Sequence, residues 1–180
     1  SIDLESWPQA FTALLNESDL GIITSVMSLL LGFTASRPEV FESCVPAVIN
    51  ILTRLVVHRQ CPPDYQYYRI PSPWLQVKCL RFLQYYENPK DNENRNALKD
   101  IITKIFVRSD NTESVNKANA EHCIIYEGIS LITSYGVQDA DDELRKEVQS
   151  LLGKFVGSKD ANIRYLALEG LSRVARLEGS

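Results

Sequence analysis

The sequence has few of the residues that build catalytic or metal sites. Its 180 residues include only two histidines, His58 and His122, and none of its four cysteines lies in a C-x-x-C pair. Cys123 follows His122 directly, but consecutive residues of a helix point in different directions and do not face each other. The eight glycines form neither a G-x-G-x-x-G motif nor a phosphate-binding G-x-x-x-x-G-K motif. We therefore predict that the chain is not an enzyme and that it has no cofactor and no metal site.

Long hydrophobic segments and an excess of positive charge are missing too. The most apolar run, Leu20–Phe33, has 14 residues, whereas a helix needs about 20 apolar residues to cross a bilayer. Lysine and arginine number 19 against 23 acidic residues, a net charge of −4, which argues against nucleic acid as a partner. The cysteines lie far apart, so we expect reduced, structural thiols in a cytosolic protein. Because the chain begins at Ser1 without methionine, we expect residues 1–180 to be one segment of a longer protein.

What the sequence does contain is a repeated segment. Asp160–Leu171 reads DANIRYLALEGL, and its pattern of apolar positions recurs at Ser72–Leu83, Tyr126–Ile129 and Asp19–Leu30. The last apolar positions of the four copies are separated by 53, 46 and 42 residues: Leu30, Leu83, Ile129 and Leu171. Periods of this size are typical of HEAT and armadillo repeats, in which helical hairpins stack into one continuous core.

The residues of DANIRYLALEGL have two expected roles. The apolar stripe that we expect to be buried consists of Ile163, Ala167, Leu168 and Leu171. Asp160 and Arg164 are four residues apart, and we expect them to hold the turn of a helical hairpin or to bridge adjacent repeats. Both roles are structural, so this segment predicts architecture rather than a binding site.

Apolar spacing predicts an all-α solenoid of about eight helices, which form four antiparallel pairs. The expected helices span residues 5–15, 19–34, 38–58, 73–86, 92–107, 118–134, 140–156 and 161–176. Pro46 should kink the third helix or mark a later start. Ser36–Glu39 reads as a capping box, Ser72 and Asp160 as N-caps, and Gly136 as a left-handed helix end. Alternation typical of strands and hairpin turns is absent.

One connection between expected helices is unusual. Arg59–Pro71 reads RQCPPDYQYYRIP, with three prolines and three tyrosines, which predicts a stiff aromatic loop. Its tyrosines Tyr65, Tyr67 and Tyr68, with Trp74 just beyond, could present exposed anchors for a partner. Alternatively, the loop folds down and seals the ends of neighbouring helices, which is the interpretation that we favour.

The basic residues near this loop also allow two interpretations. Six of them fall close together in the sequence: Arg54, His58, Arg59, Arg69, Lys78 and Arg81. They could form a patch for an acidic peptide, a phosphate or an anionic lipid headgroup. The alternative, which we favour, is that they are ordinary solvated cations on helix faces and ends. We keep seven residues as candidates for partner binding: Arg59, Tyr65, Tyr67, Tyr68, Arg69, Lys78 and Arg81.

Four segments resemble the trunk of the large adaptin subunits of clathrin adaptor complexes. They are Tyr67–Tyr86, Asn119–Ile132, Leu151–Val156 and Asn162–Leu171. The D-x-x-I-R-x-x-A pattern at Asp160–Ala167 is similar to the second helix of HEAT repeats. The Tyr-Tyr pair followed by Pro-x-Pro-Trp-Leu, and the N-A-x-x-x-x-I-x-E-x-I-S-L-I run, are most similar to alpha-type adaptins.

The resemblance implies a non-catalytic scaffold within a longer α-solenoid trunk. In that family the large subunit assembles with a second large subunit, a medium subunit and a small subunit. The complex recruits clathrin and cargo during endocytosis and is peripheral at plasma-membrane coated pits, where accessory proteins also bind. The family's basic phosphoinositide site lies before the part that this chain resembles, and no matching lysine cluster occurs here.

Two other functions remain open at the level of sequence. A HEAT-repeat scaffold of the nuclear-transport or phosphatase type would share the periodicity, although it explains the tyrosine-proline segment less well. A module that binds anionic lipid headgroups would use the basic residues around the aromatic loop.

Overall fold

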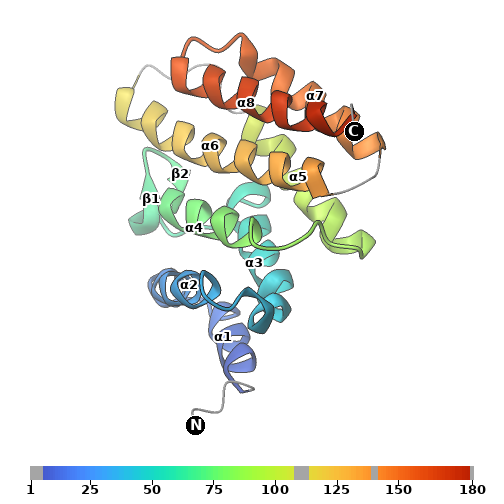
Figure 1. The fold of residues 1–180 in the computed structure, drawn as a ribbon. Helices are drawn as coiled ribbons and strands as arrows, with labels where there is room; N and C mark the ends of the chain where they lie inside the picture. Colours follow the sequence, from blue (N-terminus) through green and yellow to red (C-terminus); the bar gives the residue numbers. More distant parts are fainter. Residues whose placement is uncertain (1–5, 108–113, 139–141, 179–180) are drawn as a thin grey trace.

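The computed structural model describes residues 6–107, 114–138 and 142–178, and it shows a stack of four helical hairpins (Figure 1). The first hairpin consists of α1 (Trp7–Leu15) and α2 (Leu20–Thr34), and the second of α3 (Val45–Leu52) and α4 (Pro73–Leu83). The third consists of α5 (Asn92–Val107) and α6 (Val115–Gln138), and the last of α7 (Asp142–Val156) and α8 (Ala161–Glu178). The predicted eight-helix solenoid is therefore confirmed.

The hairpins stack so that their second helices form one layer. In that layer α2 packs on α4, α4 on α6, and α6 on α8. The first helices form the other layer, in which α3 lies between α1 and α5. Buried apolar side chains make one cluster that runs through all four hairpins. This arrangement buries the apolar faces that no single hairpin could bury alone.

Most of the repeated positions occupy this core. Leu30, Leu83 and Ile129 are fully buried, and Leu171 packs against the core while it stays partly exposed. Ile163 and Ala167 are buried as predicted, but Leu168 is 52% exposed, so its prediction was wrong. Its counterpart Leu80 on α4 is buried, whereas its counterpart Tyr126 on α6 is 45% exposed.

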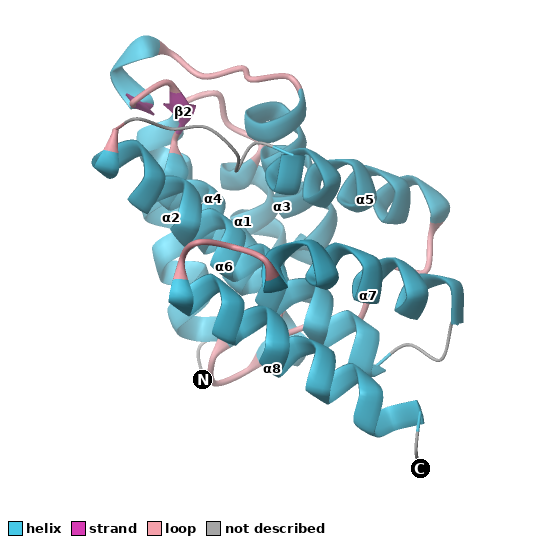
Figure 2. Cartoon of the chain, turned by 90° about the horizontal axis from the view of Figure 1, so that it is seen from above, coloured by secondary structure: helices cyan, strands magenta, loops and turns pink. Residues whose placement is uncertain are grey.

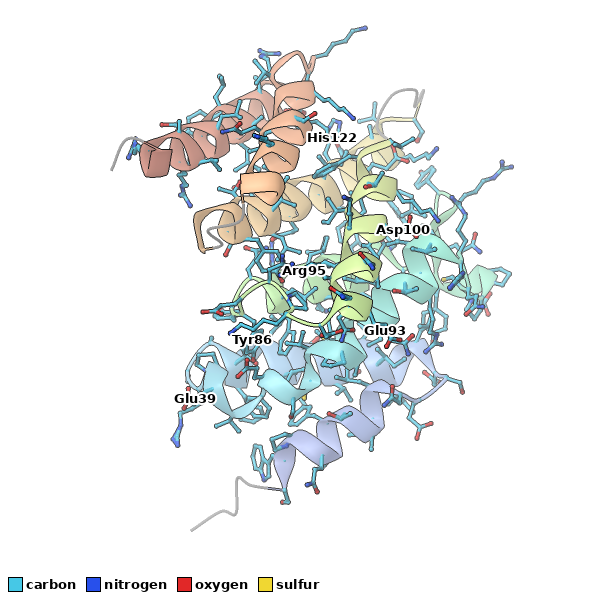
Figure 3. The ribbon with its side chains drawn as sticks, turned by 90° about the vertical axis from the view of Figure 1, so that its right-hand side faces the viewer. Glu39, Tyr86, Glu93, Arg95, Asp100 and His122 are labelled. Carbon is cyan, nitrogen blue, oxygen red and sulfur yellow. The ribbon has the colours of Figure 1, made fainter. Side chains whose placement is uncertain are left out.

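The segment expected as one helix over residues 38–58 is broken into shorter pieces. Two 3₁₀ turns, η1 (Pro38–Val40) and η2 (Glu42–Cys44), precede α3, and the π-helical turn η3 (Thr53–Val57) follows it. Pro46 lies in the first turn of α3, where its missing N–H has no intrahelical partner to lose. It marks a later start, which is one of its two predicted effects. Figure 3 shows Tyr86 beside these turns, and its hydroxyl donates to the Pro38 carbonyl at 3.0 Å.

The predicted helix ends are confirmed in part. The Asp160 carboxylate accepts from the backbone N–H groups of Asn162 and Ile163, so it caps α8. The capping box at Ser36–Glu39 was wrong, because no side chain caps η1. Ser72 precedes α4 but caps nothing with its hydroxyl, since its backbone is left-handed. Gly136 lies inside α6 rather than at its end.

A short β-hairpin interrupts the helices, contrary to the prediction that hairpin turns are absent. Strands β1 (Gln66–Tyr67) and β2 (Ile70–Pro71) pair antiparallel, with Gln66 opposite Pro71. The hairpin lies at one edge of the stack, beside the beginning of α6 (Figure 2). None of the helices in the described ranges is both long and apolar enough to cross a membrane.

Candidate functional site

The connection between the helices of the second hairpin, residues 58–72, contacts three repeats. The Tyr65 ring lies over Gly21 of α2 so closely that a Cβ there would be 2.9 Å from the tyrosine oxygen. On the other side, the Asn116 side-chain amide at the start of α6 donates to the Tyr68 hydroxyl at 3.0 Å. Within its own hairpin, the buried Gln76 of α4 donates to the Pro71 carbonyl. The connection is thus packed against its neighbours and is also a surface feature.

This connection contains every non-glycine residue with positive φ in the described part of the chain. These are Arg59 (54°), Tyr68 (49°), Arg69 (64°) and Ser72 (41°). A left-handed backbone costs an L-residue roughly 1–2 kcal/mol. Tyr68 and Arg69 form the two-residue turn between β1 and β2, with positive φ at both positions as in a type I′ turn. Asn-Gly is the preferred sequence there, so Tyr-Arg is an unfavourable choice for the turn itself.

The aromatic side chains of the connection form a small exposed group with Trp74. The rings of Tyr67 and Tyr68 meet edge to face at 4.8 Å, and Tyr67 lies 6.2 Å from Trp74 between ring centroids. Tyr67 is 38% exposed, Tyr68 47% and Trp74 52%. We call these three residues the aromatic group. Its rings are held by one another and remain accessible, which is the geometry that an anchor for a partner requires.

The predicted basic residues do not form one patch. Arg59 Nη2 donates to the Arg69 carbonyl at 2.9 Å, and both arginines line a cavity of about 210 Å³ between the hairpin, α5 and α6. Lys117 of α6 lines the same cavity, which sequence spacing did not reveal because Lys117 lies far from the arginines in the chain. Lys78 and Arg81 of α4 do not line this cavity.

Arg81 instead belongs to a polar cluster between α4 and α6. Its Nε lies 2.6 Å from the Glu127 carboxylate, and the Gln84 side chain donates to the other carboxylate oxygen at 2.9 Å. The Glu127 side chain is only 7% exposed, so these donors satisfy a carboxylate that would otherwise be costly to bury. Sequence reasoning missed Glu127, although the letters YEGI had already marked its segment as a repeat.

Two hollows that share Gln84 lie on the second-helix layer beside this cluster, and we treat them as two parts of one surface feature. One part, of about 650 Å³, lies between α2 and α4 and includes Tyr85, and a second part, of about 570 Å³, lies between α6 and α8 and includes Tyr126. Gln84 lines both parts, so they adjoin. Tyr85 and Tyr126 are 46% and 45% exposed. We call this feature the second-layer groove.

The turn between α7 and α8 is built by local hydrogen bonds. The Arg164 guanidinium donates to the carbonyls of Ser158 and Lys159 at 2.7 and 3.0 Å, so it holds the hairpin turn, one of its two predicted roles. Hydrogen bonds, above all from the Ile163 N–H, lower the pKa of Asp160. Figure 3 shows His122 on α6 near this turn, with its Nδ1 3.2 Å from the Asp160 carboxylate.

The thiols of the described interior are set by burial. Burial raises the pKa of the thiols of Cys44 and Cys79, which keeps them protonated. Cys123 is exposed, and all four cysteines are free. Within the described residues, no group of three histidine, cysteine or acidic side chains could hold a metal ion.

Comparison with known proteins agrees with this geometry. The family model described as "Adaptin N terminal region" matches residues 2–179. The chain is 39% identical over 174 residues to AP-2 complex subunit alpha-1 of Arabidopsis thaliana, which covers 97% of the chain and 17% of that protein. It is 37% identical to AP-2 complex subunit alpha-2 of Dictyostelium discoideum (96% of the chain, 17% of that protein) and 28% identical to AP-1 complex subunit gamma of the same organism (97% and 19%). The chain spans less than a fifth of the length of these relatives. It belongs to the adaptin N-terminal region family, which is non-catalytic.

Proposed function

We propose that the chain is a scaffold segment in the trunk of an alpha-type large subunit of a clathrin adaptor complex, and that residues 1–180 are one part of that longer solenoid. The observation that carries this is the match over nearly the whole chain, with higher identity to the AP-2 alpha subunits of Arabidopsis thaliana and Dictyostelium discoideum than to the AP-1 gamma subunit of the latter. The two layers of helices supply the matching physical property, an extended surface without a catalytic centre.

The proposed mechanism is the display of partner-binding surfaces on a rigid stack. The buried faces of the hairpins stabilise the array, and the exposed faces of α2, α4, α6 and α8 stay free to bind. The partners in this proposal are the medium subunit, the small subunit and the second large subunit, with endocytic accessory proteins as further candidates. Through the intact complex, the chain would act at plasma-membrane coated pits in endocytosis and vesicle-mediated protein transport.

The second-layer groove is the surface that best fits a partner subunit. It combines two half-exposed tyrosines, Tyr85 and Tyr126, with the polar cluster around Glu127. Aromatic residues beside a satisfied polar network are typical of the strongest contacts in protein interfaces. The aromatic group on the 58–72 connection is a second candidate contact, and of the seven residues kept from the sequence it contains Tyr67 and Tyr68.

Co-purification with the medium and small adaptor subunits of the same organism tests this proposal, with the longer trunk as a positive control. We expect Tyr85→Ser and Tyr126→Ser each to weaken retention, since truncation of an interface anchor costs about 2 kcal/mol or more. Tyr165→Ser is the matched control, because Tyr165 is 70% exposed on α8 but lines neither part of the groove. Equal retention of all three variants would exclude the groove, and no retention of the longer trunk would exclude the assembly itself.

The aromatic group is tested separately. Tyr68→Ala removes a ring from the group and the hydrogen bond from Asn116. Loss of partner binding at an unchanged melting temperature would identify the group as an anchor. Unchanged binding with a lower melting temperature would show that the loop serves packing alone.

A further inference from the structure

The cavity beside the β-hairpin collects positive charge from three separate elements. Arg59 follows η3, Arg69 lies in the turn between β1 and β2, and Lys117 lies in the first turns of α6. One acidic side chain, Glu121, lines the cavity with them and lies 3.7 Å from Lys117. Three cations against one carboxylate leave a surplus of two positive charges around a space of about 210 Å³.

A hydrogen bond from the Arg59 guanidinium to the Arg69 backbone leaves donors of both arginines available. The hydrogen bond from Arg59 to the Arg69 carbonyl uses one N–H of the Arg59 guanidinium. An arginine has five N–H donors in a rigid plane, which suits two oxygens of one phosphate. Arg69 itself contributes its carbonyl to this contact, so its guanidinium is not consumed by it.

The choice of residues in the turn points to a role beyond folding. Arg69 has a φ of 64° and Arg59 a φ of 54°. Glycine would fit either position at no steric cost, and a two-residue turn of this type favours it at the place of Arg69. Local rules of this kind are broken at functional sites, where the side chain is needed for another purpose.

The residues that line the cavity indicate whether its anion belongs to a lipid or to a protein. The buried part of its lining is mostly aliphatic, with Ile105, Ile124 and Ile125 from the third hairpin and Gln76 as the polar exception, whereas Arg59 and Arg69 are exposed. The net charge of −4 opposes the approach of the whole chain to an anionic membrane surface, whereas a single phosphate meets the local surplus of positive charge around the cavity. A recess with a cationic rim and an aliphatic floor fits a phosphate on a short apolar stem. We propose that this cavity binds a phosphorylated side chain of a partner protein.

A short peptide with phosphoserine between two valines is the probe, and its unphosphorylated copy is the control. Binding is followed by NMR through the Nε–Hε signals of the arginines in the 180-residue chain. We expect the phosphopeptide to shift the signals of Arg59 and Arg69 in a saturable way, and the control peptide to leave them unchanged. Because hydrogen bonds to charged groups are among the strongest, Arg69→Gly should weaken binding about tenfold or more.

Arg69→Gly is chosen because glycine suits the turn, so the variant should melt at the same temperature as the wild type or higher. Lys104→Gln is the control for charge, since Lys104 lies on α5, pairs with Asp100 at 3.4 Å and does not line the cavity. It should bind the phosphopeptide as the wild type does. If both variants weaken phosphopeptide binding equally, the effect comes from the overall charge of the chain, and the proposal is overturned.

The remaining outcomes are equally decisive. Absence of saturable binding, or binding unchanged in Arg69→Gly, overturns the site. Inorganic phosphate that binds as tightly as the phosphopeptide shows a site for free anions and overturns the protein-borne ligand. Arg69-dependent sedimentation with vesicles of phosphatidylserine and phosphatidylcholine, without phosphopeptide binding, assigns the cavity to lipid instead. None of these results depends on assembly with adaptor subunits, so the two proposals can fail separately.

Discussion

Two connections in this chain occupy the same place in the repeat and are built in opposite ways. Residues 157–160 join α7 to α8, and residues 58–72 follow η3 and lead into α4. The first has no residue with positive φ, and its polar groups are satisfied by three side chains, Ser158, Asp160 and Arg164. The second contains four left-handed residues and reaches across to α2 and α6.

This difference indicates that the short turn has a structural role and that the long connection is the candidate for partner binding. A short turn that satisfies its own hydrogen bonds fixes the angle between two helices and offers little to a partner. A long connection that keeps strained residues and exposed rings must be held by its neighbours, because strain of this kind persists only where the surroundings enforce it. The cavity and the aromatic group both lie at the second connection, which is why both proposed contacts there involve residues 59–74.

The largest expected effect comes from releasing the long connection from α4. Gln76→Met keeps the volume of the buried side chain but removes its hydrogen bond to the Pro71 carbonyl. A buried carbonyl left without its donor costs about 1–3 kcal/mol. We expect the free energy of unfolding, measured in urea, to fall by that amount.

Gln60→Met is the matched control for this change. Gln60 is exposed and lies in the same connection, so its substitution should change stability by less than about 0.5 kcal/mol. Equal losses in the two variants would mean that the bond to Pro71 does not hold the connection.

A smaller effect is expected at the short turn. Asp160→Ala removes the cap of α8 and the contact with His122. Loss of an N-cap costs about 1 kcal/mol. Asp160→Asn should recover most of this loss, since asparagine caps as well as aspartate does. If alanine and asparagine prove equally destabilising in urea, the cap is not what stabilises this turn.

The same carboxylate predicts a dependence on pH. The Ile163 N–H is the main cause that lowers the pKa of Asp160 below 3.8 in the folded chain. A lowered folded pKa means that the stabilisation is complete above 3.8 and is lost as the pH falls through the folded value. We therefore expect the stability difference between the wild type and Asp160→Asn to decline as the pH falls below about 4. A difference that grows as the pH falls below about 4 would contradict this sign.

The short turn is also the region that the sequence predicted best. Periodicity places helices and core positions because burial of one face imposes a spacing, and Asp160 was recognisable because a cap acts within three residues. Leu168 was misjudged because its burial depends on a neighbouring helix rather than on its own. Local rules of this kind succeeded at Asp160 and failed at Ser36, Ser72 and Gly136.

The candidate site at the long connection was only half predictable. The composition of residues 59–71 marked an aromatic and basic loop, but the β-hairpin could not be foreseen from a Tyr-Arg turn. Lys117 lines the same cavity as Arg59 and Arg69 only because the third hairpin stacks on the second. Arg81 does not line that cavity and forms an ion pair with Glu127 of α6 instead. Such groupings depend on packing between repeats, about which spacing within one segment carries no information.

The smallest expected effect distinguishes the two connections most directly, because its sign is unusual. Arg69→Gly removes the strain of a left-handed residue, which costs roughly 1–2 kcal/mol. The greater freedom of glycine in the unfolded chain destabilises the variant by about 0.4–1 kcal/mol. The net change is a stabilisation of about 1 kcal/mol or less. Ala175→Gly, at an exposed position within α8, should instead lose about 1 kcal/mol, as glycine does inside helices. Thermal unfolding of both variants gives the two signs, and a loss in Arg69→Gly as large as that in Ala175→Gly would mean that the arginine stabilises the hairpin and that its position is structural.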